Sequence, residues 1–244
     1  MNLIIDIGNS LTKVYLFDEG RAVESFVIDK TIIPFIQQLL IDYKSIKRAI
    51  ISSTRDYDPE ISGLLDKLPD GWSELTSETE LPIANKYKTP ETLGKDRLAA
   101  VVGAQTLFPG RNVLVIDAGT AITYDIINEL GEYYGGSISP GLLMRFRALH
   151  QFTGRLPLLM PRDRFEFPGN STEEAIISGV EQGILFEIEA YIAHFKKNYK
   201  NLEVIFTGGD SNFFDSKLKN SFFVCSNLVA FGLNRILDHN AKKY

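Results

Sequence analysis

The chain has 244 residues, of which 44% are hydrophobic and 23% are charged, and its formal net charge at pH 7 is -5. This balance excludes a long disordered chain, and the negative charge argues against a general nucleic-acid binder, which needs a basic surface. The single cysteine, Cys225, excludes an intramolecular disulfide. The first residues lack the features of a signal peptide, and no run of about 18 apolar residues follows. We therefore expect a cytoplasmic protein that binds neither nucleic acid nor a membrane.

Two segments of the chain resemble each other. Residues 3–12 (LIIDIGNSLT) align with residues 114–123 (LVIDAGTAIT), and in both an apolar strand ends in an acid and passes through a glycine into a second β-type run. This pattern predicts two β-hairpins. Because the hairpins repeat, we expect two related halves, with boundaries at 1–110 and 111–244.

Helices and strands are expected to follow each hairpin. Hydrophobic periodicity and stop signals predict helices at 32–43, 96–107 and 172–199. Strands are predicted at 49–52 and 204–206, and a further strand is expected to end near Ile138. The polar segment 57–91 is expected to hold short helices and loops. The pattern indicates an α/β protein in which each half has a β-sheet flanked by helices.

The first hairpin carries groups that suit a nucleotide phosphate. Its segment Asp6-Ile7-Gly8-Asn9-Ser10-Leu11-Thr12-Lys13 combines a strand-end carboxylate, a glycine turn and a lysine. The glycine lets backbone N–H groups approach phosphate oxygens, the carboxylate can hold a hydrated Mg2+, and the lysine can neutralise phosphate charge. These residues fit a plain hairpin with Asp and Asn as turn formers equally well.

Two later segments extend this pattern. The second hairpin repeats the acid and the glycine as Asp117-Ala118-Gly119-Thr120-Ala121, and Thr207-Gly208-Gly209-Asp210 follows a short buried strand. Two acid-glycine hairpins can hold a polyphosphate and its cation, and a bare glycine backbone can lie against adenine or ribose. A glycine pair by itself predicts only a turn, so the ordered set of three is the specific signal.

The segment Gly94-Lys95-Asp96-Arg97 opens the second predicted helix. Asp96 can accept the proton of an alcohol, and Arg97 can bind a carboxylate through two hydrogen bonds. An ordinary helix start, with Asp96 as cap and solvated charges, is the alternative.

Two stretches favour structural roles. Residues 145–167 interleave arginines with aromatic residues, which could suggest a nucleic-acid surface, but the net charge favours a solvated face or a subunit contact. Helical spacing of Ile176, Val180, Ile184 and Ile188 predicts a core or a dimer interface.

The two hairpins and the glycine pair, in this order, resemble the phosphate and adenosine motifs of the actin, hexokinase and Hsp70 ATPase superfamily. Within it, nearly the whole chain closely resembles type III pantothenate kinase. Gly94-Lys95-Asp96-Arg97 matches that family's Gly-x-Asp-Arg, and residues 135–141 and Asn170-Ser171-Thr172 are also similar. The resemblance implies two actin-like (ribonuclease H-like) halves, each a mixed β-sheet flanked by helices, with the active-site cleft between them.

The resemblance also implies roles for individual residues. ATP would be bound by Asp6, Ile7, Gly8, Asn9, Ser10, Leu11, Thr12, Lys13 and Thr120. Asp6 would lie nearest a Mg2+ held through water, and Asp117 would ligate a monovalent cation, K+ or NH4+. The pantothenate site would be formed by Tyr87, Gly94, Lys95, Asp96, Arg97 and Thr172. Asp96 would be the general base. The chain departs from many members at Ser10, where they carry threonine, but the hydroxyl is kept.

The implied activity is the ATP-dependent phosphorylation of pantothenate to 4'-phosphopantothenate, the first step of coenzyme A synthesis, by a homodimer. Two alternatives stay open. One is a sugar kinase or polyphosphate phosphatase of the same superfamily, although such sugar kinases are longer and space their catalytic aspartate differently. The other is a non-catalytic, ATP-gated regulatory protein, which would not need Asp96.

Overall fold

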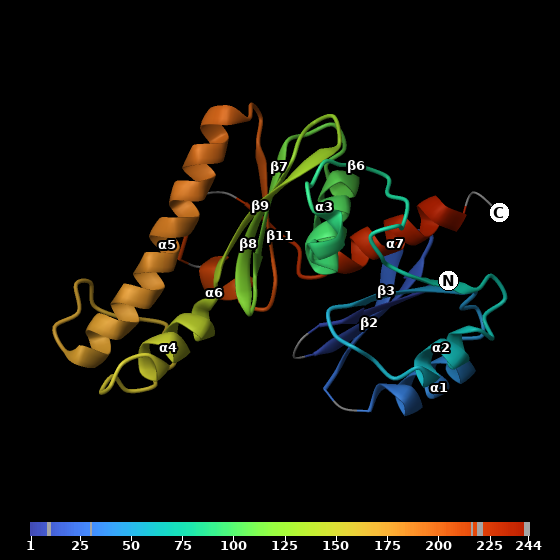
Figure 1. Cartoon of the computed structure of the whole chain (residues 1–244), viewed down its shortest axis with the longest axis horizontal. Helices are drawn as coiled ribbons and strands as arrows, with labels where there is room; N and C mark the ends of the chain where they lie inside the picture. The colour runs from blue at the N-terminus through green and yellow to red at the C-terminus, as the bar shows by residue number, and fades with distance from the viewer. Residues whose placement is uncertain (9–10, 30, 216, 219–221, 242–244) are drawn as a thin grey trace. The chain divides into compact units, whose positions relative to one another are not determined.

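The computed structural model describes residues 1–8, 11–29, 31–215, 217–218 and 222–241. The chain forms two compact units (Figure 1). The first unit comprises Met1–Pro109, Gly131–Tyr134 and Asn227–Tyr244, and the second comprises Gly110–Leu130 and Gly135–Ser226. The division expected from the repeat, 1–110 and 111–244, differs from these packing units because the C-terminal segment packs in the first unit.

The sheet of the first unit has the strand order β3-β2-β1-β4-β5. Its strands are β1 (Asn2–Ile7), β2 (Thr12–Asp18), β3 (Arg21–Ile28), β4 (Arg48–Ser53) and β5 (Trp72–Glu74). β1 is antiparallel to β2, the next strand in the chain, and parallel to β4, which follows a helical crossover. Side chains alternate between the two faces, so Leu3, Ile5 and Ile7 pack with α1 (Ile32–Asp42) and α2 (Glu60–Leu65).

The other face of this sheet contacts α3 (Lys95–Leu107) and α7 (Leu228–Ala241), which pack side by side (Figure 1). A Cβ atom on Gly232 would collide with the Ala99 backbone, and one on Gly103 with the Leu228 backbone. These glycines therefore allow the two helix backbones to approach closely. Arg48 fixes α7 to β4, because its Nη2 donates to Asp238 at 2.8 Å.

The sheet of the second unit repeats the arrangement of the first. Its strands are β7 (Val113–Ala118), β8 (Ala121–Ile127), β9 (Glu132–Pro140), β10 (Glu203–Thr207) and β11 (Phe223–Val224). The strand order is β11-β10-β7-β8-β9-β6, in which β6 (Ala84–Asn85) pairs with the first residues of β9. As for β1, the central strand β7 is antiparallel to the next strand, β8, and parallel to a later strand, β10.

Helices α4 (Leu142–Gln151) and α5 (Thr172–Asn198) pack against this sheet, and the short helix α6 (Ser211–Asp215) follows β10 (Figure 1). The Ser171 side chain caps α5 by accepting from the Glu174 N–H. The predicted apolar stripe of α5 is buried in the core of this unit, with Ile184 and Ile188 fully inaccessible. The stripe therefore forms core, one of the two outcomes that its spacing predicted.

The predicted α/β class is confirmed, and each of the three predicted helices is present within one residue at either end. The segment 57–91 was only partly predicted, because it holds β5 and β6 as well as α2 and the 3-10 helix η1 (Pro90–Thr92). Strand β3 and helices α4 and α7 were not predicted. No helix in the described part of the chain combines the length and the apolar character needed to cross a membrane.

Candidate active site

The carboxylate of Asp6 lies in a row of polar side chains on the first sheet. The strand registers place Lys13 of β2 on one side of Asp6 and Ser52 of β4 on the other. Residues paired across neighbouring strands point to the same face, so the three side chains are neighbours. The Gly8 N–H donates to the Leu11 carbonyl at 3.0 Å and closes the turn. Within the predicted phosphate segment, positions 9 and 10 lie outside the described residues.

The surroundings of Asp6 disfavour its charge. Burial raises the pKa of its carboxyl from 3.8 to about 6, against the lowering effect of Lys13, and the negative charge of Asp96 raises the pKa further. Asp96 therefore lies near enough to Asp6 for the two charges to interact. A cation bound beside Asp6 would favour the ionised carboxylate, and the site therefore suits a positively charged ligand.

Asp96 belongs to the first turn of α3. Its Oδ1 accepts a hydrogen bond from the Arg97 N–H at 2.8 Å and lies so close to Gly94 that a Cβ there would clash with it. Gly94 is the N-cap residue, so Asp96 is not the cap that an ordinary helix start would use. Its negative charge near a helix N-terminus is stabilised by the helix dipole.

Lys95 forms a polar cluster with two residues that precede it in the chain. Its Nζ lies 3.0 Å from Glu74 Oε1, and the Tyr57 hydroxyl donates to Glu74 Oε2 at 3.0 Å. These residues line a cavity of about 580 Å3, together with Arg55 and others that follow β4. The carboxyl ends of parallel strands are the usual place for ligands in such sheets.

Arg97 and Tyr87, both predicted to contact pantothenate, lie together. The guanidinium carbon is 5.7 Å from the Tyr87 ring centroid, and that ring stacks on Tyr133 with centroids 6.2 Å apart. Only 6% of Arg97 is exposed. The alternative of an ordinary helix start required solvated charges, so the burial of Arg97 counts against it.

In the second hairpin, both residues that face the acid carry a hydroxyl group. The register places Asp117 between Thr123 of β8 and Thr207 of β10. Thr123 Oγ1 is buried and has no hydrogen-bond partner among the described residues. The Gly119 N–H donates to the Ala121 carbonyl at 3.0 Å, so the turn holds residues 119–121.

These registers correct the simple alignment of the two hairpins. That alignment matches Thr12 with Thr123, whereas the residue facing Asp6 is Lys13 and the residue facing Asp117 is Thr123. The first turn is one residue longer, since Ile7 pairs with Thr12 but Ala118 pairs with Ile122. The repeat therefore holds for the strands and the acids, and not for the residues opposite the acids.

The glycine pair after β10 packs on the second hairpin. Gly208 has φ +91°, and a Cβ there would collide with the Ala118 carbonyl and Asp117 Oδ1. The Asp210 N–H donates to the same Ala118 carbonyl at 2.9 Å, and burial raises the pKa of the Asp210 carboxyl. This predicted adenosine segment therefore lies beside the predicted cation site.

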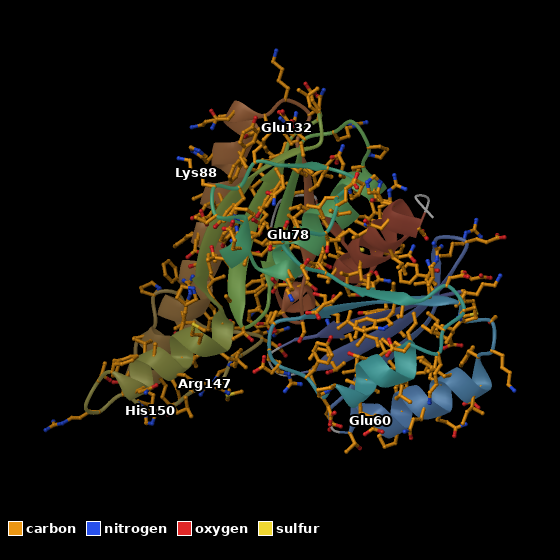
Figure 2. The ribbon with its side chains drawn as sticks, turned by 45° about the vertical axis from the view of Figure 1, so that its right-hand side comes forward. Glu60, Glu78, Lys88, Glu132, Arg147 and His150 are labelled. Carbon is orange, nitrogen blue, oxygen red and sulfur yellow. The ribbon has the colours of Figure 1, made fainter. Side chains whose placement is uncertain are left out.

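Thr172, unlike the other predicted pantothenate residues, belongs to the second unit. It lines an apolar cavity of about 850 Å3 between α4 and α5, as does Arg145. Arg145 donates to Glu187 at 2.6 Å and to Ser139 Oγ at 3.0 Å, so the expected solvated face is wrong for this residue. Arg147 and His150 do lie on the outer side of α4 (Figure 2).

The family model for type III pantothenate kinase matches residues 2–194. The chain belongs to this family. It is 50% identical to the type III pantothenate kinase of Phocaeicola vulgatus over 242 residues, which cover 99% of this chain and 100% of that protein. The enzyme of Bacteroides fragilis is 49% identical over 240 residues, covering 98% of each. A glucokinase from an Antarctic psychrotroph shares the fold, with a TM-score of 0.55 and 10% identity over 98% of both chains.

Sequence reasoning missed three polar residues of these sites: Ser52, Glu74 and Thr123. Ser52 and Thr123 are ordinary strand residues in the sequence, and only the strand registers place them next to the two acids. Glu74 lies in the segment expected to be loop, and nothing in the sequence links it to Lys95. Once the second hairpin was predicted, pairing its two strands outward from the turn could have identified Thr123 as the residue that faces Asp117.

Proposed function

We propose that this chain transfers the γ-phosphoryl group of ATP to the primary hydroxyl of pantothenate, giving ADP and 4'-phosphopantothenate, the first step of coenzyme A synthesis. The observation that carries the proposal is family membership over residues 2–194, together with full-length relatives named for this activity. The electrostatic effect of Asp96 on Asp6 supports the chemistry, because the proposed base and the carboxylate proposed for the metal would act on the same phosphoryl group.

In the proposed reaction, Asp96 accepts the hydroxyl proton while the alcohol oxygen attacks the γ-phosphorus and the bond to ADP breaks. The transition state of phosphoryl transfer is loose, so positioning and charge neutralisation supply most of the rate. Lys13 neutralises phosphate charge, with the turn 8–11 and Thr120 also binding ATP. Tyr87, Arg97, the backbone at Gly94 and Thr172 hold pantothenate, whose carboxylate suits a guanidinium. Lys95, held by Glu74, orients the same segment.

As a kinase of this family, the chain uses ATP with a divalent metal. No group of three or more His, Cys, Asp or Glu side chains among the described residues could hold a metal by itself. This fits Mg2+, which keeps several waters and binds through nucleotide phosphates and one or two carboxylates. Asp6 is the carboxylate that would hold it through water, and bound Mg2+ would neutralise charge on the phosphates.

The second hairpin is proposed to bind K+ or NH4+. Asp117 supplies a carboxylate, and the unpartnered Thr123 Oγ1 beside it supplies a further oxygen. Potassium is bound in proteins by oxygen atoms that replace its hydration shell. Such a cation would offset phosphate charge without a further lysine at this hairpin.

A homodimer is also part of the proposal. The second unit exposes large apolar side chains on α4, α5 and the segment that joins them: Met144, Phe152, Leu158, Met160, Phe167 and Phe186. Exposed apolar patches of this kind are typical of protein interfaces. Light scattering with size-exclusion chromatography would test the dimer. A cytoplasmic location is proposed because ATP is supplied there.

The decisive test is ADP release measured with pantothenate and with candidate sugars, in K+, in NH4+ and in Na+. We expect turnover with pantothenate in K+ or NH4+, and little in Na+. Absence of pantothenate-dependent turnover in K+ would sink the proposal, and turnover with a sugar alone would favour the sugar-kinase alternative.

The Asp96→Asn variant tests the base. It should bind ATP normally but lose roughly 10²–10⁴-fold in kcat, the usual contribution of a positioned proton acceptor. Unchanged turnover would remove Asp96 from this role and leave a non-catalytic use of the same site as the better explanation.

A further inference from the structure

The side chain of Ser52 is buried and lacks a partner. Ser52 is fully inaccessible in β4, and its Oγ has no hydrogen-bond partner in the described part of the structure. A buried hydroxyl without a partner lowers stability, so most buried polar groups are paired. The position would favour alanine or valine if it served only the core.

Asp6 is the polar group beside this hydroxyl. The register pairs Ser52 with Asp6 across β4 and β1, which places both side chains on one face. The preceding pair on that face, Ile4 and Ile50, is apolar and fully buried. Ser52 therefore meets its polar neighbour at the carboxyl end of the strands, where Asp6 begins the phosphate segment.

The same pairing occurs in the second unit. Asp117 of β7 pairs with Thr207 of the parallel strand β10, as Asp6 of β1 pairs with Ser52 of the parallel strand β4. Each acid thus has a buried hydroxyl residue on its parallel side, at equivalent places in two sheets. A chance polar residue in one core would not explain both positions.

We propose that Ser52 is a positioning residue for Asp6. Its hydroxyl donates a hydrogen bond to one carboxylate oxygen when Mg2+-nucleotide binds, which leaves the other oxygen to bind a water of the metal. This inference rests on the proposed function. A carboxylate can accept up to about four hydrogen bonds and a serine hydroxyl rotates freely, so a change of rotamer at Ser52 or Asp6 is sufficient to form the bond.

The bond is absent in the ligand-free protein, so it contributes to binding and not to folding. Removing the hydroxyl should therefore weaken metal-nucleotide binding by roughly ten- to hundredfold, the usual effect of one hydrogen bond to a charged group. The melting temperature of the ligand-free protein should stay the same or rise, because an unpaired buried group is lost.

Calorimetric titration with ADP, in Mg2+ and in excess chelator, measures this effect without turnover. The parent chain, Ser52→Ala and Ser53→Ala are compared, each with its ligand-free melting temperature. Ser53 is the matched control, since its Oγ is already bonded to the Arg55 carbonyl at 2.5 Å and its side chain faces the other side of the sheet. Ser53→Ala should lower the melting temperature and leave the gain in affinity from Mg2+ unchanged.

The expected result is that the affinity of Ser52→Ala falls by roughly ten- to hundredfold in Mg2+ and is unchanged in chelator. Equal Kd values of Ser52→Ala and the parent in Mg2+ would overturn the inference while leaving the proposed function intact. So would a parallel loss with and without Mg2+ and a lower melting temperature, which would mean a structural role. Failure of the parent chain to bind Mg2+-ADP would overturn the proposed function and the inference together.

Discussion

The two hairpins share an acid and a glycine and differ in what stands beside the acid. Asp6 lies between an ammonium, on Lys13, and a hydroxyl, on Ser52. Asp117 lies between two hydroxyl residues, Thr123 and Thr207. One of the two residues that face Asp6 is cationic, whereas both residues that face Asp117 are neutral. This difference supports the proposal that one backbone pattern holds a water-bound Mg2+ in one unit and a monovalent cation in the other.

One residue in a turn produces this difference. The first turn holds residues 8–11 and the second holds residues 119–121, so the position facing the acid is shifted by one along the returning strand. Since side chains alternate along a strand, such a shift replaces every residue that shares a face with the acid. The hairpin length therefore sets the charge of the site.

The Asp6→Asn substitution tests this comparison with the largest expected effect. We expect kcat/KM for Mg2+-ATP to fall roughly 10²–10³-fold, because a preorganised charge is lost. The ligand-free protein should become more stable near pH 7.5. Folding raises the pKa of the Asp6 carboxyl, so the folded chain holds this proton more tightly than the unfolded chain. The stability that Asp6 contributes is therefore full below pH 3.8 and is lost as the pH rises through about 6. Asparagine avoids that loss, which is on the order of 1–3 kcal/mol.

Melting temperatures of Asp6→Asn and the parent at pH 7.5 and pH 4 measure this effect. The difference should nearly vanish at pH 4, where the carboxyl is mostly protonated in the folded chain. A less stable variant at pH 7.5 would show that Asp6 supports the fold instead.

Asp117→Asn tests the other hairpin and should have the next largest effect. Activity in K+ should fall by roughly tenfold or more, as for the loss of a metal-site group, and should become equal in K+ and Na+. Nucleotide binding in Mg2+ without K+ should change little. Initial rates over a series of K+ concentrations decide this, and a variant that still distinguished K+ from Na+ would place the cation elsewhere.

The pH dependence of kcat/KM for Mg2+-ATP tests the first hairpin alone, and its expected effect is smaller. The pKa of Asp6 is about 6, so kcat/KM for Mg2+-ATP should decline as pH falls below that value, because the protonated acid no longer attracts the metal. Lys13→Met should move this acidic limb to higher pH, since Lys13 lowers the pKa of Asp6. If the acidic limb of the Lys13→Met profile stayed at the pH of the parent, that limb would report the titration of another group.

Thr123→Ala should have the smallest effect. Loss of its hydroxyl should raise the K+ concentration for half-maximal activity by roughly two- to fivefold, the value of one neutral hydrogen-bonding contact. Thr123→Ser keeps the oxygen and serves as the control. Equal K+ dependence in all three proteins would exclude Thr123 from the site.

Local patterns predicted much of this molecule. The acid-glycine hairpins at Asp6 and Asp117, the helix opening at Lys95 and the buried stripe of α5 all follow from short-range signals, namely periodicity, turns and caps. The family motif around Asp96 led to the substrate.

Long-range packing explains what sequence reasoning missed. The pairing of Ser52 with Asp6 spans β1 and β4, and the ion pair of Lys95 with Glu74 depends on how the loop after β4 returns to β5. Helix α7 packs with the first unit although it comes last in the chain. Its glycine contact with Ala99 is visible only once both helices are folded.

The position of α7 has a consequence for synthesis on the ribosome. The strands of the first unit emerge early, yet the helix that packs on β1 and β4, and on the helix carrying Asp96, is translated only after the second unit. The nascent unit must wait with the α7 sides of this sheet face and of α3 uncovered while the second unit is made. A premature stop codon before residue 228 would therefore remove a helix from the core of the first unit and not a dispensable tail.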